Sequence, residues 1–137
     1  MKKFLLVLSV LMLLSSVTYA AARVVIPLQS IAGNGASIAT ITWTSADASN
    51  DHYFDNTSSQ VLLFIKNGAG TRTVTVASVA DPYGRTGDLS IACTANGYSV
   101  AGPFPPFLFN QAAAKINIDI TDGTSLFFAA VKYTPPK

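Results

Sequence analysis

Hydrophobic and polar positions alternate along several short stretches of the chain. In residues 71–76, an arginine and two valines alternate with three threonines. In residues 115–120, three isoleucines alternate with polar side chains. Because successive side chains of a strand point to opposite faces of a sheet, both stretches predict half-exposed strands of an antiparallel sheet.

The chain after residue 22 has a β-type composition throughout. Val, Ile, Thr, Phe and Tyr form short runs, which turn pairs such as Asn96-Gly97 and Asp122-Gly123 separate. These runs predict about eight strands, at residues 24–31, 37–44, 60–66, 71–79, 88–94, 98–101, 115–120 and 125–133. No helical period is present beyond one short turn at residues 112–114. The expected fold class is all-β, as a single antiparallel β-sandwich or jelly-roll-like domain over residues 23–137.

The first 22 residues have the pattern of a secretory signal peptide. Two lysines precede an apolar run from Phe4 to Leu14, and small residues follow up to Ala22. The apolar run is shorter than the roughly 20 residues that a membrane span needs. We therefore expect cleavage after Ala20 or Ala22, secretion to the cell surface, and a mature form with no membrane segment.

Charge is sparse and balanced in the expected mature chain. Charged residues make up 12% of the sequence, where about 25% is usual, and all seven acidic residues are aspartates. Removal of Lys2 and Lys3 from the nine basic residues leaves seven, so the mature chain is net neutral. The remaining basic residues are scattered, which argues against nucleic-acid binding. A surface so poor in charge favours self-association.

Three runs are apolar on both faces, at residues 24–28, 61–65 and 126–131. Such strands must be covered on both sides, whereas a two-layer sandwich covers only one side of each sheet. Either loops of the same chain or a neighbouring subunit supply the second cover. The first run lies in a segment that we call the N-terminal arm, residues 23–31. Because Pro27 has no N–H, this arm suits an edge strand or a strand exchanged with a neighbour.

Residues 102–109 read G-P-F-P-P-F-L-F and combine three prolines with three phenylalanines. The prolines exclude a central strand, so the segment is either a crossover that fills the core or a rigid aromatic contact surface. The arm, this segment and the last strand supply the candidate subunit contacts, which are Val24, Val25, Ile26, Leu28, Phe104, Phe107, Phe109 and Phe127.

Patterns of catalysis and metal binding are weak. A single histidine, His52, excludes a site with several histidine ligands, and we expect it in an exposed loop. Cys93 is also single, and we expect a buried thiol, with an intermolecular disulfide as the alternative. Asp47, Asp51 and Asp55 are weak candidates for calcium ligands, and a solvated polar loop is the favoured interpretation. We expect neither catalysis nor a cofactor.

Several motifs occur in a fixed order along the chain. Residues 61–70 read V-L-L-F-I-K-N-G-A-G and precede T-V-T-V at 73–76, while G-P-F-P-P at 102–106 precedes F-N-Q at 109–111. Together with F-A-A-V at 128–131, they resemble small tailed-phage capsid-auxiliary (head-decoration-like) proteins, over most of the mature chain. The resemblance implies a compact β-sandwich that oligomerises, packs on an ordered protein array and has no catalytic residues. The signal peptide predicts a secreted relative of that module.

These inferences predict a non-enzymatic structural subunit. It is exported and self-assembles into an extracellular filament or surface layer, with the N-terminal arm as the exchanged strand. A protein that decorates a capsid or another array is the alternative, and a carbohydrate-binding module is a distant third. The expected partners are further copies of the chain, as a homo-oligomer or homopolymer, and neither nucleic acid nor a membrane.

Overall fold

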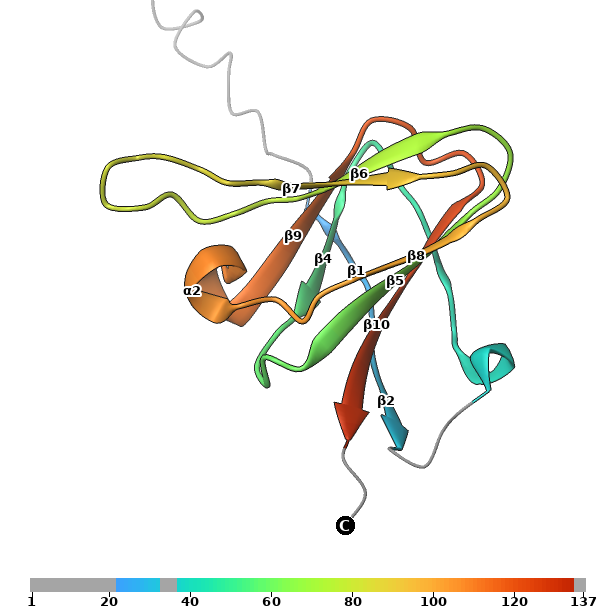
Figure 1. Cartoon of the computed structure of the whole chain (residues 1–137), viewed down its shortest axis with the longest axis horizontal. Coiled ribbons are helices and arrows are strands. Elements are labelled where there is room, and N and C mark those ends of the chain that lie inside the picture. The colour runs from blue at the N-terminus through green and yellow to red at the C-terminus, as the bar shows by residue number, and fades with distance from the viewer. Residues whose placement is uncertain (1–21, 33–36, 135–137) are drawn as a thin grey trace, which may run out of the picture.

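Ten strands form two sheets in the computed structural model, which describes residues 22–32 and 37–134 (Figure 1). The two sheets pack face to face and enclose the hydrophobic core. The predicted signal peptide lies outside the described residues, apart from its last residue, Ala22. Within the described residues, no helix is long and apolar enough to cross a membrane.

Sheet A has the strand order β1-β4-β9-β6-β7. Its strands are β1 (Val24–Val25), β4 (His52–Asp55), β9 (Lys115–Ile120), β6 (Arg72–Val76) and β7 (Leu89–Cys93). All neighbours are antiparallel except β1, which runs parallel to β4. The three isoleucines of β9 are buried, and the polar residues between them are only partly buried. The predicted half-exposed strand is therefore confirmed.

Sheet B has the strand order β2-β10-β5-β8. Its strands are β2 (Leu28–Ala32), β10 (Leu126–Thr134), β5 (Val61–Asn67) and β8 (Tyr98–Ala101). A short strand, β3 (Thr44–Ser45), pairs with the start of β10, beyond the stretch that pairs with β2. Here too the arm strand is the exception, because β2 runs parallel to β10.

In residues 22–32 and 37–134, helical structure is confined to short turns: η1 (Ile38–Thr40), α2 (Pro106–Phe109) and η2 (Ala112–Ala114). Pro106 occupies the first helical position of α2, where a missing N–H costs no hydrogen bond. The N–H of Asn110 closes the turn on the Pro106 carbonyl at 2.9 Å. The sequence therefore confines α2 to a single turn, which reverses the chain between β8 and β9.

The core contains aromatic rings from both sheets and from the segment before α2. Phe54, Phe128 and Phe104 are its largest buried side chains, and the rings of Phe54 and Phe104 lie 5.7 Å apart. Each such side chain contributes roughly 1.5–3 kcal/mol when it is fully buried. The proline-rich segment thus supplies a ring to the core, as one of the two interpretations predicts.

The all-β sandwich predicted from the sequence is confirmed, and four details of the prediction are wrong. There are ten strands in the described residues rather than about eight, and both arm strands pair in parallel rather than antiparallel. Residues 52–55 form β4 where a polar loop was expected. Residues 37–44 contain η1 and only the first residue of β3. The Gln29 side chain bonds both the N–H and the carbonyl of Thr42 (2.8 and 2.7 Å), so no strand partner is needed there.

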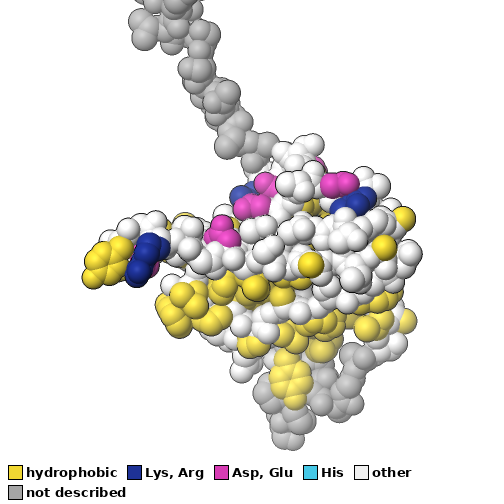
Figure 2. Space-filling model, turned by 45° about the horizontal axis from the view of Figure 1, so that its top comes forward, with side chains coloured by type: hydrophobic (Ala, Val, Ile, Leu, Met, Phe, Trp, Pro, Cys, Tyr) yellow, Lys and Arg dark blue, Asp and Glu magenta, His cyan; other side chains and the backbone are white. Residues whose placement is uncertain are grey.

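On the face of the molecule that Figure 2 shows, hydrophobic and charged side chains gather in different regions. Figure 2 shows charged side chains in the upper half of the view and hydrophobic ones mainly across the lower half. On the outer side of sheet A, the exposed or half-exposed positions include Thr73, Thr75, Asn117 and Asp119. On the outer side of sheet B, the exposed or half-exposed positions are mostly apolar and include Tyr98 and Val100.

Candidate assembly surfaces

The N-terminal arm contributes one strand to each sheet. Its β1 forms an edge of sheet A and its β2 forms an edge of sheet B, on the same side of the sandwich. Between them, Ile26 is only 1% exposed and lies in the core, while the neighbouring Pro27 is exposed. The N–H of Ile26 donates to the Tyr53 carbonyl at 2.7 Å. Pro27 therefore occupies the crossing between the sheets, where no N–H is required.

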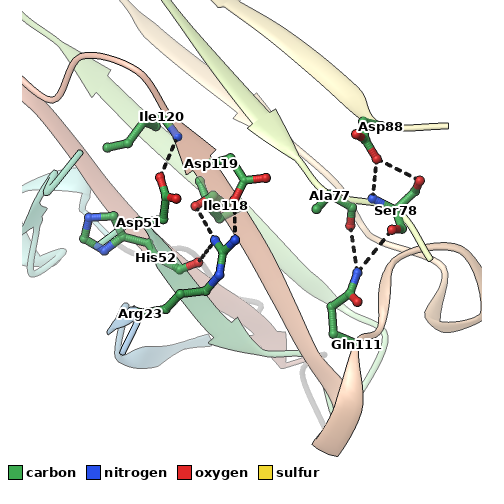
Figure 3. Close-up of polar contacts among 10 residues, drawn as sticks. All are labelled: Arg23, Asp51, His52, Ala77, Ser78, Asp88, Gln111, Ile118, Asp119 and Ile120. Atoms are coloured by element: carbon green, nitrogen blue, oxygen red, sulfur yellow. Dashed lines mark hydrogen bonds and ion pairs between the residues drawn. The ribbon is translucent and has the colours of Figure 1, made fainter. Parts of the chain in front are cut away.

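Arg23 anchors the start of the arm (Figure 3). Its guanidinium forms an ion pair with Asp119 at 2.6 Å and donates to the Ile118 carbonyl at 3.1 Å and to the His52 carbonyl at 3.4 Å. Both ionic side chains remain partly exposed, so the pair itself contributes at most about 1 kcal/mol. The arm is therefore stabilised mainly by burial of the Ile26 side chain and by the backbone pairing of β1 with β4 and of β2 with β10.

The other predicted contacts of the arm lie at the surface or near it. Val24 is half-buried, Val25 is 45% exposed and Leu28 is 36% exposed. The structure places Ile26 differently, because its side chain is enclosed by its own domain. Ile26 can therefore contact a neighbouring subunit only if the arm leaves its own sandwich.

The outer face of sheet B is apolar, and the chain itself covers only part of it. Ala129 and Val131 on β10 are fully buried. The ring of Trp43 lies 6.1 Å from that of Tyr98 on β8. In contrast, Tyr98 is 61% exposed and Val100 is 54% exposed. Parts of the same chain therefore cover one region of this face and leave another open, and cover of the open region by a neighbouring subunit stays a prediction.

Phe127, the predicted contact on the last strand, lies on this outer face. It is half-buried, and the Lys66 ammonium lies 5.7 Å from the centre of its ring. Phe127 pairs with Lys66 across the β10–β5 ladder, and Lys66 in turn pairs with Tyr98 on β8. Lys66 thus places a positive charge among these aromatic rings.

The connection between β6 and β7 projects from the sandwich, and we call residues 77–88 the finger (Figure 1). At its base, the Asp88 carboxylate accepts from both the N–H and the hydroxyl of Ser78, each at 2.8 Å (Figure 3). These hydrogen bonds lower the pKa of Asp88. The Gln111 amide donates to the carbonyls of Ala77 and Ser78 at 3.4 and 3.2 Å. The base of the finger is therefore tied to the turn after α2.

The tip of the finger is an ordered turn around one carboxylate. Asp81 accepts from the backbone N–H groups of Tyr83 and Arg85, both at 2.9 Å, and from the Arg85 guanidinium at 2.7 Å. The bonds from Arg85 are the largest cause of the lowered pKa of Asp81. Gly84 adopts the left-handed conformation that this turn needs, with φ at 76°. The turn leaves Tyr83 84% exposed, with the Arg85 guanidinium 5.3 Å from its ring centre.

Sequence reasoning missed the finger. The available signal was an aromatic residue two positions before an arginine, in a stretch between two strands that lacks an alternating pattern. Because the strand at 71–79 was predicted too long, the length of the connection was underestimated. In the structure β6 ends at Val76, and the finger begins at Ala77.

The three phenylalanines of the proline-rich segment have different environments. Phe104 is buried, and its ring lies 5.7 Å from those of both Phe54 and Phe109. Phe109 is half-buried, whereas Phe107 on α2 is 80% exposed beside the exposed Leu108. The structure therefore corrects Phe104 from a surface contact to a core residue of its own domain. Phe107 lies on the surface, close to the base of the finger, where the Val79 N–H donates to the Leu108 carbonyl at 2.7 Å.

The expectation that His52 lies in an exposed loop is wrong. It is fully buried on β4, with its ring edge against Phe128 at 5.2 Å. Its Nε2 accepts a hydrogen bond from the N–H of Asp47 at 2.8 Å. Burial lowers the pKa of the imidazole, so the neutral form fits this site. The polar neighbours of His52 in the sequence concealed a strand whose inward side chains are His52 and Phe54.

The three weak calcium candidates have other partners or lie apart. Asp47 caps its own turn by accepting from the N–H of Ser49 and the amide of Asn50, and these bonds lower its pKa. Asp51 accepts from the N–H of Ile120 at 3.0 Å (Figure 3). Asp55 is exposed at the end of β4. In the part of the chain that the structure describes, no group of three or more His, Cys, Asp or Glu side chains is arranged to hold a metal ion.

Cys93 is a free, buried thiol at the end of β7, as the sequence predicts. Burial raises the pKa of this thiol. The protonated form is therefore favoured, which makes Cys93 a poor nucleophile.

Comparison of the chain with protein-family models, with curated proteins and with solved structures gives no match. The resemblance to phage capsid-auxiliary proteins therefore rests on its short motifs alone. The surfaces that remain as candidates for function are the N-terminal arm, the outer face of sheet B, and the finger with α2.

Proposed function

We propose that this protein is an exported, non-enzymatic structural subunit that self-assembles into an extracellular filament or surface layer. In this proposal, the N-terminal arm leaves its own sandwich and completes both sheets of a neighbouring copy. The observation that carries the proposal is that the arm occupies an edge of sheet A and an edge of sheet B on the same side of the molecule.

The energetics of the arm allow an exchange between copies at low cost. When the arm leaves, the edges of β4 and β10 open, and the space of Ile26 in the core is vacated. Burial of that side chain contributes roughly 1.5–3 kcal/mol, and the edge hydrogen bonds add to it. An identical arm from another copy makes the same contacts, so the exchange costs little beyond association itself.

The surface chemistry also supports self-association. The mature chain is net neutral, and the outer face of sheet B keeps exposed apolar side chains such as Tyr98 and Val100. Exposed apolar patches of this kind usually mark a contact surface. The export step of the proposal rests on the signal-peptide pattern of residues 1–22.

Deletion of the arm tests the proposal. We expect protein that lacks residues 23–31 to be folded, as judged by a cooperative thermal transition, but to sediment as a monomer. A synthetic peptide of residues 23–31 should then bind and raise the melting temperature. A control peptide with Ile26→Asp should fail, because it would place a charge in the core. Polymerisation of the truncated protein would contradict the arm as the linker.

The alternative is a binding protein that decorates an existing array. The exposed rings of Tyr83 in the finger and Phe107 on α2 favour it, because the finger and α2 lie on one side of the sandwich (Figure 1). Negative-stain imaging of the purified protein separates the two functions. Filaments or layers formed by the protein alone support the structural subunit, whereas single particles at every concentration support the decoration protein.

A further inference from the structure

A small hollow opens on the outer side of sheet B, where β5 begins and β10 ends. It measures about 260 Å³ and is lined by Gln60, Leu62, Pro103 and Tyr133, with no charged side chain among the described residues that line it. This volume is below the roughly 300–1,000 Å³ typical of small-molecule sites. An apolar cavity of about 150 Å³ already accommodates a benzene ring. The hollow is therefore large enough for one aromatic side chain and too small for most ligands.

The tip of the finger presents such a side chain in a fixed position. Among the described residues, Tyr83 is the most exposed of the large hydrophobic side chains. Four contacts to Asp81 hold the turn that carries it, so little conformational entropy is lost when the ring is buried. The charge of Arg85 is paired with Asp81, which lets the tip enter an uncharged hollow without an unpaired ion.

The finger and the hollow lie at different places on the molecule. The finger extends from the ends of β6 and β7 that face α2, whereas the hollow lies where β5 starts and β10 finishes (Figure 1). The finger and the hollow are different surfaces, so a single contact between them in each pair of copies joins the copies head to tail. Such contacts give rings or open filaments, whereas two copies that exchange fingers reciprocally form a closed dimer.

We propose that the Tyr83 ring of one copy inserts into the hollow of the next copy. The ring packs against Leu62 and Pro103, and Gln60 and Tyr133 complete the mainly apolar lining. This inference rests on the proposed function, because it names a contact by which the subunits assemble. A second copy is the favoured occupant because one neutral chain carries both the fixed aromatic ring and an uncharged hollow of matching size.

A double-mutant cycle tests this contact. The variants are Tyr83→Ala, Leu62→Lys and their combination, each purified after expression of the full chain and measured by sedimentation velocity. We expect each single variant to weaken association at least about 30-fold, the loss that removal of an interface hot spot produces. Because both changes remove one contact, the double variant should lose no more than either single variant.

Matched controls separate the contact from general effects. Tyr83→Phe should keep most of the association, since the ring remains. Ile38→Ala removes an exposed hydrophobic side chain on η1, outside the arm, the outer face of sheet B, the finger and the hollow, and should associate like the wild type. Gln60→Arg places a charge at the rim of the hollow from an exposed position and should reproduce the effect of Leu62→Lys. If Leu62→Lys lowers the cooperativity of unfolding, Gln60→Arg still tests the contact, because Gln60 is exposed.

The outcomes distinguish this inference from the proposed function. If the wild type associates and Tyr83→Ala or Gln60→Arg does so equally well, the finger contact is wrong while self-assembly stands. If the losses of the single variants multiply in the double variant, Tyr83 and Leu62 act at separate contacts, and the inference is also wrong. If the wild type stays monomeric, the proposed function fails and the finger contact fails with it.

Discussion

Replacement of Ile26 by alanine tests how the N-terminal arm is held. Ile26 is the arm's one buried side chain among those that the structure describes. The change removes three buried carbons, worth about 0.8 kcal/mol each, or about 2.4 kcal/mol in all. The cavity left behind adds to this cost, and comparable substitutions total about 2–5 kcal/mol. A domain with about 5–15 kcal/mol of stability remains folded after such a loss.

Urea unfolding of the monomeric form measures this cost. We expect Ile26→Ala to lower the transition midpoint with no change in the slope m, because the folded and unfolded states keep their compactness. Val25→Ala is the matched control, since Val25 lies one residue away and is largely exposed, and it should change stability by no more than about 0.5 kcal/mol. In the assembled form, the same loss should appear as faster dissociation of subunits. A loss below about 1 kcal/mol for Ile26→Ala would refute the docking of the arm described above.

Three further predictions concern pH, the thiol and metal ions. Because burial lowers the pKa of His52 in the folded state, the unfolded chain binds the proton first, and stability should fall as the pH drops below about 6.5. His52→Gln should remove this pH dependence of the free energy of unfolding, as measured by urea titrations. If the pH dependence is unchanged in the variant, another titratable group causes it. Cys93→Ala should cost about 1 kcal/mol and leave assembly intact, whereas a dimer on non-reducing gels would indicate an intermolecular disulfide. EDTA should alter neither assembly nor the melting temperature. A large decrease in the melting temperature would indicate that Asp47, Asp51 and Asp55 bind calcium.

Strands with a clear alternation were predictable from the sequence. In β9 the isoleucines and polar residues alternate over the whole strand, and its bounds, Lys115–Ile120, agree with the prediction. β4 was missed because it spans only four residues, begins with His52 and ends with Asp55. A neutral, buried histidine fills an apolar position there, which no scale of hydrophobicity indicates. The pattern of residues alone cannot show that its Nε2 finds a backbone partner.

The candidate surfaces depended on tertiary contacts that the sequence does not encode locally. Phe104 and Phe107 lie three residues apart in one proline-rich segment, yet one is buried and the other exposed. The turn of α2 decides which ring faces the core. Likewise, Pro27 indicated an edge position for the arm, but the division of the arm between two sheets follows from its pairing with β4 and β10.

A disulfide between the arm and its partner strand tests the exchange of the arm most directly. Val25 on β1 pairs with Tyr53 on β4. Neighbouring strands lie about 4.7–4.9 Å apart, which is within the range of Cα separations that a disulfide spans. We would therefore introduce Val25→Cys and Tyr53→Cys together with Cys93→Ala, oxidise the assembled protein, and run it on a denaturing, non-reducing gel. Arm exchange predicts a ladder of covalently linked subunits. A single monomer band with the mass of a closed disulfide would contradict it, because each arm would then be docked in its own sandwich.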